Sequence, residues 1–198
     1  HLWNRYPPPN GDKDFRDATV SWLNRRYKLP TDFLDADVNI MPVPGTREPL
    51  YQIGFICVPP EKNGQRPAVL MPNPFYHVYQ GAAMAGGAEA VYLPAEPENN
   101  FFPCLEDLST DLLQRTAIFF LCSPANPQGT VADKIYLKKL IELARQYDFI
   151  VAFDECYCEI YRDDPPLGGL QVCSELGLDL ANVLSFNSLS KRSSAPGL

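Results

Sequence analysis

A lysine among small hydroxyl side chains is the first feature of this chain that could support covalent chemistry. Lys191 lies in the segment "SLSKRS", directly behind the apolar run Val183–Phe186. A lysine amine can form a Schiff base with a carbonyl compound, and Ser188 in the same segment can hydrogen-bond an anion. Taken alone, such a segment is more often a solvated loop, so the rest of the chain has to support any sharper interpretation.

Further polar and aromatic side chains also come directly after apolar runs. They are Tyr76 and Tyr79 in "PNPFYHVYQG", Asn126 in "SPANPQGT", and Asp154 and Tyr157 in "DECY". Each has an ordinary explanation. A carboxylate at a strand end is more often a cap or an ion-pair partner, a tyrosine there can be part of the core, and "SPANPQGT" alone is typical of a proline-rich turn.

The elements that would position these residues are read from the apolar runs. The runs are continuously apolar, as expected of strands that are covered on both faces. They are Ala68–Met71, Ala90–Leu93, Ala117–Cys122, Phe149–Phe153 and Val183–Phe186. Helix-like stretches separate them, and this alternation predicts an α/β fold with a three-layer, doubly wound and mainly parallel sheet.

Two helices have the clearest periodicity. One is expected over Val131–Tyr147, and Thr130, three residues before Asp133, resembles the start of a capping box. The other is expected over Phe15–Tyr27, with Val20, Leu23 and Tyr27 on one side.

In a parallel sheet, ligands bind beyond the carboxyl ends of the strands, so the polar residues above should meet at one edge. Upstream, Gly45 and Thr46 in "PVPGTREPLY" stand where a helix would begin, which offers backbone N–H groups to an anion. Together these groups match the needs of pyridoxal phosphate. That cofactor requires a lysine for the Schiff base, an acid for its pyridine nitrogen, donors for its phenolic oxygen and phosphate, and an aromatic face.

The same stretches resemble the class I/II aminotransferases, which are fold-type I pyridoxal phosphate enzymes. The matching segments are "PGTREPLY", "NPFYHVY", "SPANPQGT", "FDECYCEIY" and "SLSKRSSAPGL", in the order and at the intervals typical of that family, from about residue 5 onward. The wording of "GTREPLYQI" and "NPFYHVYQGAA" is further similar to proteobacterial succinyldiaminopimelate aminotransferases of lysine biosynthesis.

The resemblance implies a role for each candidate residue. Lys191 would carry the cofactor and shuttle the proton, Asp154 would contact the pyridine nitrogen, and Tyr157 and Asn126 would hydrogen-bond the phenolic oxygen. Tyr76 would stack on the ring. Gly45, Thr46, Arg47 (through its backbone N–H) and Ser188 would form the phosphate site.

It also implies what lies outside the sequence. The family places a phosphate-binding arginine directly after Leu198 and a substrate-carboxylate arginine in a later small domain. We therefore expect residues 1–198 to be the cofactor-binding large domain, without its N-terminal arm and C-terminal small domain. Amino-acid and keto-acid substrates and a homodimer are expected from the same resemblance.

Composition excludes several other classes. A net charge of -7 provides no basic stripe for nucleic acid, and no apolar run approaches the roughly 20 residues that span a bilayer. The six cysteines are scattered and only two histidines exist, so we expect reduced thiols, no metal site and a cytoplasmic protein.

Three alternatives remain open. The first is a non-catalytic pyridoxal phosphate-binding domain of a transcription regulator, which a fused DNA-binding domain would reveal. The second is another fold-type I chemistry, a carbon–sulfur lyase or a decarboxylase, which would release its product without an amino acceptor. The third is an α/β domain without a cofactor, which five ordered motifs disfavour.

Overall fold

The computed structural model describes residues 6–196. The two ends of the expected domain, including Gly197 and Leu198 of the last motif, lie outside the described residues.

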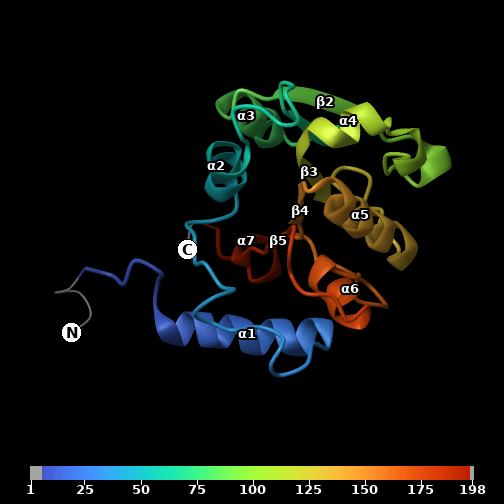
Figure 1. Cartoon of the computed structure of the whole chain (residues 1–198). Helices are drawn as coiled ribbons and strands as arrows, with labels where there is room; N and C mark the ends of the chain where they lie inside the picture. Colours follow the sequence, from blue (N-terminus) through green and yellow to red (C-terminus); the bar gives the residue numbers. More distant parts are fainter. Residues whose placement is uncertain (1–5, 197–198) are drawn as a thin grey trace.

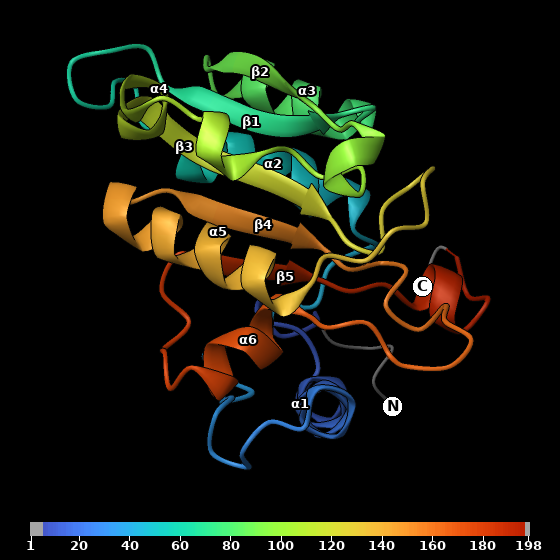
Figure 2. The same cartoon turned by 90° about the vertical axis from the view of Figure 1, so that its right-hand side faces the viewer.

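One parallel sheet organises the chain, with its strands in the order β2-β1-β3-β4-β5 (Figure 2). The strands are β1 (Ala68–Asn73), β2 (Glu89–Pro94), β3 (Thr116–Cys122), β4 (Ile150–Asp154) and β5 (Val183–Phe186). The chain moves from β1 outward to β2 and then returns to the other side of β1 to place β3. The order of the strands thus reverses between β1 and β3, which is where doubly wound sheets bind ligands.

Helices cover both faces of the sheet (Figure 1). α2 (Arg47–Cys57) and α3 (His77–Ala85) pack on one face, while α1 (Lys13–Tyr27), α4 (Thr110–Arg115), α5 (Lys134–Tyr147) and α6 (Gly169–Glu175) belong to the other. α7 (Leu189–Arg192) follows β5, and two short 3-10 helices, η2 (Pro97–Asn99) and η3 (Leu105–Asp107), lie between β2 and α4.

The strand side chains alternate between these two layers. In β4, Val151 and Phe153 join the core beneath α5 and α6, whereas Ala152 joins the core beneath α2 and α3. This alternation continues past the end of the strand. Asp154 reaches Tyr79 of α3, and Glu155 reaches Tyr27 of α1. Two consecutive carboxyl groups are therefore delivered to opposite faces of the sheet.

The predicted fold class is confirmed, and all five predicted strands are present with small shifts of their ends. β5 matches the prediction at both ends, and β4 begins and ends one residue later than predicted. That shift makes Asp154 the last residue of β4, paired in register with Cys122 of β3.

The predicted start of the Val131–Tyr147 helix is wrong. α5 begins at Lys134, and its N-cap is Asp133, whose carboxylate accepts the Tyr136 N–H at 2.8 Å. Thr130 is not the cap, because the helix starts three residues later than predicted, after Asp133. The Thr130 backbone carbonyl accepts the Ala125 N–H and closes the loop after β3. That loop positions Asn126 at the cavity, and residues 131–133 of the predicted helix connect the loop to α5.

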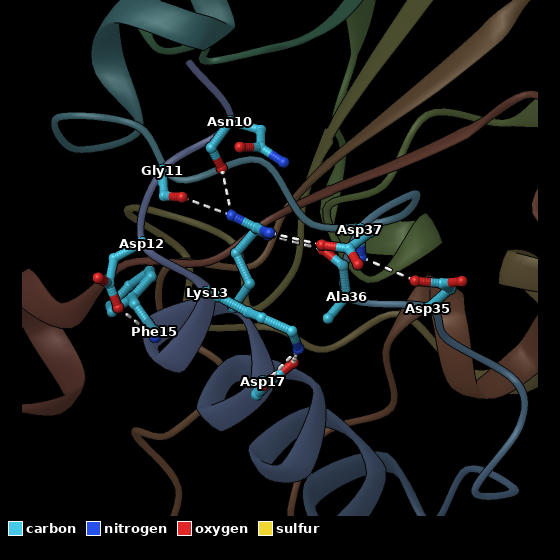
Figure 3. A network of polar contacts seen from close by, with 10 residues as sticks. Asn10, Gly11, Asp12, Lys13, Phe15, Asp17, Asp35, Ala36 and Asp37 are labelled. Atoms are coloured by element: carbon cyan, nitrogen blue, oxygen red, sulfur yellow. Dashed lines mark hydrogen bonds and ion pairs between the residues drawn. The ribbon is translucent and has the colours of Figure 1, made fainter. Parts of the chain in front are cut away.

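The first predicted helix, Phe15–Tyr27, begins two residues earlier, as α1, after the N-cap Asp12. Leu23 and Tyr27 are buried as predicted, and Val20 is partly buried against the same core. Arg16 is also buried, at 4% exposure. Its guanidinium donates to the carbonyls of Asn10, Gly11 and Ala36 and pairs with Asp37, joining the segments on either side of α1 (Figure 3).

Candidate active site

A cavity of about 800 Å³ opens at the carboxyl edge of the sheet, where the ends of β1, β3 and β4 meet the starts of α2 and α7. Its volume is within the range of ordinary ligand sites. All nine residues that the sequence nominated line this one cavity. They are Gly45, Thr46, Arg47, Tyr76, Asn126, Asp154, Tyr157, Ser188 and Lys191.

Asp154 is a deeply buried charged group of the cavity, at 4% exposure. Its Oδ2 accepts the hydroxyl of Tyr79 at 2.7 Å, and its Oδ1 accepts the backbone N–H of Cys156 at 3.4 Å. Burial raises the pKa of the Asp154 carboxyl, and these hydrogen bonds oppose that rise. Within residues 6–196 no cation pairs with it. A cationic ligand would supply the missing partner.

Tyr79 is a site residue to which sequence reasoning gave no role. It is almost fully buried, and its ring stacks on Phe120 with centroids 4.4 Å apart and planes 9° apart. Stacking and the hydrogen bond to Asp154 together fix the carboxylate. A signal was available in the sequence, because Tyr76 and Tyr79 are three residues apart at the start of a helix and so share one face.

Asn126 and Tyr157 form a second polar pair at the rim. The amide Nδ2 of Asn126 donates to the hydroxyl oxygen of Tyr157 at 2.9 Å. Because that oxygen accepts a hydrogen bond, its own O–H remains available to a ligand oxygen. Burial raises the pKa of Tyr157, although the Asn126 contact opposes the shift, so the phenol is a donor at neutral pH.

The start of α2 presents backbone donors to the same cavity. Gly45 has φ +82°, a left-handed conformation that suits glycine, and Thr46 is the N-cap of α2. The Thr46 side chain makes no capping bond, and the first N–H groups of a helix lack intrahelical partners. Both are free for an anion. Arg47 adds a contact that the sequence did not predict, because its Nε donates to the Tyr76 hydroxyl at 3.0 Å.

α7 supplies the lysine. Ser188 is its N-cap, and its hydroxyl accepts the Ser190 N–H at 3.1 Å. Lys191 lies on the following turn and lines the cavity with Asp154 and Tyr157. None of the polar contacts seen in residues 6–196 engages its amine.

Two thiols, Cys122 and Cys156, also line the cavity. Contact with the Cys122 side chain raises the pKa of the Cys156 thiol, and burial raises it further. All six cysteines are free thiols, as the sequence predicted. In the described part of the chain, no three His, Cys, Asp or Glu side chains gather as a metal site would require.

These residues fit pyridoxal phosphate chemically. A free lysine amine, a buried carboxylate without a cationic partner, a phenol with its O–H unused and a helix N-terminus converge on one cavity. Each can bind or react with one functional group of that cofactor: in the same order, the aldehyde, the pyridine nitrogen, the phenolic oxygen and the phosphate.

The curated proteins that this chain resembles in sequence include aminotransferases. The chain is 32% identical to an LL-diaminopimelate aminotransferase of Syntrophobacter fumaroxidans over 190 residues, which are 95% of this chain and 46% of that protein. It is 31% identical to an LL-diaminopimelate aminotransferase of Aquifex aeolicus over 95% of this chain and 46% of the relative. The chain thus spans about half the length of the curated relatives that it matches.

Within residues 6–196, none of the helices is both long and apolar enough to cross a membrane.

Solved structures agree with the fold. An aminotransferase from Neisseria meningitidis superposes with a TM-score of 0.90 at 42% identity, covering 98% of this chain and 48% of that one. The aminotransferase AspB from Helicobacter pylori superposes with a TM-score of 0.87 at 36% identity, covering 98% and 50%. The model of the family described as aminotransferase class I and II matches residues 1–198. The chain belongs to this family, whose members are pyridoxal phosphate-dependent.

Proposed function

We propose that the full-length enzyme moves an amino group from an amino acid, glutamate, to a keto acid. The observation that carries this proposal is that one cavity is lined both by Lys191 and by the buried Asp154, which has no cationic partner among residues 6–196. In an ordinary core, a buried carboxylate without a cation is a cost to stability. It becomes useful when a ligand brings the positive charge.

Each site residue would have a separate role toward the cofactor, which when bound supplies a group that accepts electrons from the substrate carbon. Asp154 would hold the proton on the cofactor nitrogen. Tyr157 would donate its O–H to the phenolic oxygen, and Asn126 holds that hydroxyl in place. The first turn of α2 and the Ser188 hydroxyl would bind the phosphate. The Nζ of Lys191 would take the proton from the substrate α-carbon.

A diaminopimelate-type substrate is the second part of the proposal. It is supported by the names of the relatives, which are LL-diaminopimelate aminotransferases, and it places the enzyme in lysine biosynthesis. Whether the amino acid is free or carries a succinyl group is decided by contacts to its distal end. Free thiols at all six cysteines fit a reducing cytoplasm, which we include in the proposal.

We further propose that this chain is the large domain and that the enzyme is a homodimer. The relatives are about twice as long as this chain. Their remaining length is where we place the group that binds the substrate carboxylate, since within residues 6–196 Arg47 is the one arginine that lines the cavity.

A substrate panel tests the reaction. Full-length enzyme loaded with pyridoxal phosphate is incubated with 2-oxoglutarate and either LL-diaminopimelate or its N-succinyl derivative, and glutamate formation is measured. Glutamate from either amino acid supports the proposal, and the ratio of kcat/KM values identifies the substrate. Steady keto-acid release without any acceptor would identify a lyase or decarboxylase instead. Cofactor binding without turnover of any amino donor would indicate a regulator domain.

A further inference from the structure

Glu155 is a buried carboxylate next to Asp154 that the proposed reaction does not use. It is 2% exposed and is not among the residues that line the cavity. Its Oε1 accepts the backbone N–H of Gly169 at 2.7 Å, and its Oε2 accepts the hydroxyls of Tyr27 and Ser185, each at 2.7 Å. Three donors converge on one carboxyl group, an arrangement that suits an ionised carboxylate. Burial raises the pKa of Glu155, and these three hydrogen bonds oppose the rise.

From Glu155 the hydrogen bonds continue toward the lysine. Ser185 donates to Glu155 and accepts the Nδ2 of Asn187 at 2.9 Å, and the Oδ1 of Asn187 faces the Cys158 thiol at 3.4 Å. The backbone N–H of Glu155 also donates to the Phe186 carbonyl at 2.9 Å. Asn187 directly precedes Ser188. Glu155 therefore holds β5 and the turn that leads to Lys191 by both its backbone and its side chain.

At its other end the network is anchored in α1 and α6. Tyr27 is the last residue of α1 and is 1% exposed, and Gly169 is the first residue of α6. The backbone closes tightly here, because a Cβ at Gly168 would lie 2.6 Å from the Tyr27 ring and 2.9 Å from Glu155 Oε1.

α1 also contacts α7 directly. The guanidinium of Arg192 lies 4.2 Å from the centre of the Trp22 ring, as expected of a cation–π contact. Arg192 is the residue after Lys191, and in Figure 1 α1 lies below both α6 and α7. The same helix thus supports the lysine turn from two places.

We propose that Glu155 is a positioning residue for the reaction, whose carboxylate fixes Ser185 and Asn187, and thereby the Ser188–Lys191 turn, against α1 and α6. The proposal rests on the proposed function, because the position of that turn matters only if Lys191 carries the cofactor. A shift of about 1 Å at a reacting group is enough to slow a reaction substantially. A rigid link between Glu155 and the lysine turn therefore has a functional consequence.

Ser185→Ala in the full-length protein tests the link without removing a charge. It disconnects Asn187 from Glu155, and Ser185 does not line the cavity. We expect the dissociation constant of pyridoxal phosphate to rise about three- to tenfold, as one lost hydrogen bond allows. We also expect the pH titration of the Schiff-base absorbance to shift. Tyr27→Phe should act in the same direction from the α1 end, and Glu155→Gln should have the largest effect.

Matched controls separate positioning from stability. Ser109→Ala removes the N-cap hydrogen bond of α4, at 3.2 Å to the Leu112 N–H, outside both the network and the cavity. It should lower the midpoint of thermal unfolding and leave cofactor affinity and absorbance unchanged. Tyr136→Phe is the control for Tyr27→Phe, because the buried Tyr136 hydroxyl has no hydrogen-bond partner among residues 6–196. It should leave both the cofactor affinity and the pH titration of the absorbance unchanged.

Unchanged cofactor affinity and an unchanged absorbance titration in both Ser185→Ala and Tyr27→Phe would overturn the proposal, even if both variants unfold at lower temperature. Glu155 would then only stabilise the fold. A wild-type protein that forms no Schiff base at all would instead overturn the proposed function, and the positioning role with it.

Discussion

Lys191 is the residue on which the proposed chemistry depends. It lines the cavity with Asp154 and Tyr157, and the described residues offer its amine no competing partner. We expect borohydride reduction of the cofactor-loaded, full-length protein to fix pyridoxal phosphate on Lys191, as read by mass spectrometry. Lys191→Ala should abolish turnover and retain some cofactor affinity through the phosphate contacts. Label on a different lysine would contradict the assignment.

Asp154 is under opposite demands from stability and function. Its pKa is raised above the ordinary 3.8 by burial, so folding without cofactor favours the neutral carboxyl more than the unfolded chain does. The stability that this group contributes is present below pH 3.8 and is lost as pH rises through the raised value. At neutral pH the ionised carboxylate is therefore a destabilising group until a cation binds to it.

Asp154→Asn should separate these two effects. Without cofactor, the variant should unfold at a higher temperature than wild type at pH 7, and this difference should shrink as the pH falls toward 4. With cofactor, amino transfer should slow by about 10²–10⁴, the range typical of a positioned acid–base group. A calorimetric pH series and single-turnover kinetics measure the two. A half-reaction slowed less than tenfold would remove Asp154 from its proposed role.

At the scale of elements, the sequence was most informative where the physical signal is local. Continuous apolar runs identified each strand, and the residues that follow a strand must lie at the carboxyl edge of the sheet, so six cavity residues could be named in this way. Gly45 and Thr46 were named from an expected helix start, and Arg47 from the family resemblance. Contacts between distant elements left no such signal. The bond from Tyr79 to Asp154 and that from Tyr27 to Glu155 join residues 75 and 128 positions apart. The start of α5 was also mispredicted, because two nearby residues could each have capped the helix. Asp133 is the cap, and Thr130 closes the preceding loop.

The start of α1 depends on a different kind of contact. Arg16 joins the carbonyls of Asn10, Gly11 and Ala36 to the carboxylate of Asp37, and these four partners are labelled in Figure 3. The planar fork of arginine makes this possible, and lysine could not replace it. The segment that leads toward Gly45 is therefore tied to α1 by one side chain.

Arg16→Met should lower the free energy of unfolding by about 1–3 kcal/mol, because it keeps the buried stem and loses the hydrogen bonds. Lys13→Met on the same helix is the control. Lys13 pairs with Asp17 at 2.8 Å, but its side chain is 64% exposed, so the substitution should change stability little. Urea denaturation of both variants gives the comparison. Equal stability of the two would mean that the buried arginine is dispensable.

The whole molecule leaves one helical layer incompletely covered. The outer faces of α2 and α3 expose large apolar side chains, with Phe55 59%, Ile56 76% and Met84 70% exposed. Exposed apolar groups that gather on packed neighbouring helices are typical of interaction surfaces. α2 also begins at the cavity with Thr46 and Arg47, so a partner on this face would lie next to the site.

We expect this face to contact the second subunit of the proposed homodimer, since symmetric dimers are the commonest oligomers. Ile56→Glu would bury a charge in that contact and should shift the full-length protein from dimer toward monomer. Ile135→Glu is the matched control, because Ile135 is 78% exposed on α5, in the layer on the opposite face of the sheet. Sedimentation at micromolar concentration measures both variants. A dimer that survives Ile56→Glu and dissociates with Ile135→Glu would move the interface to the α5 layer. A wild-type protein that is active as a strict monomer would contradict the dimer itself.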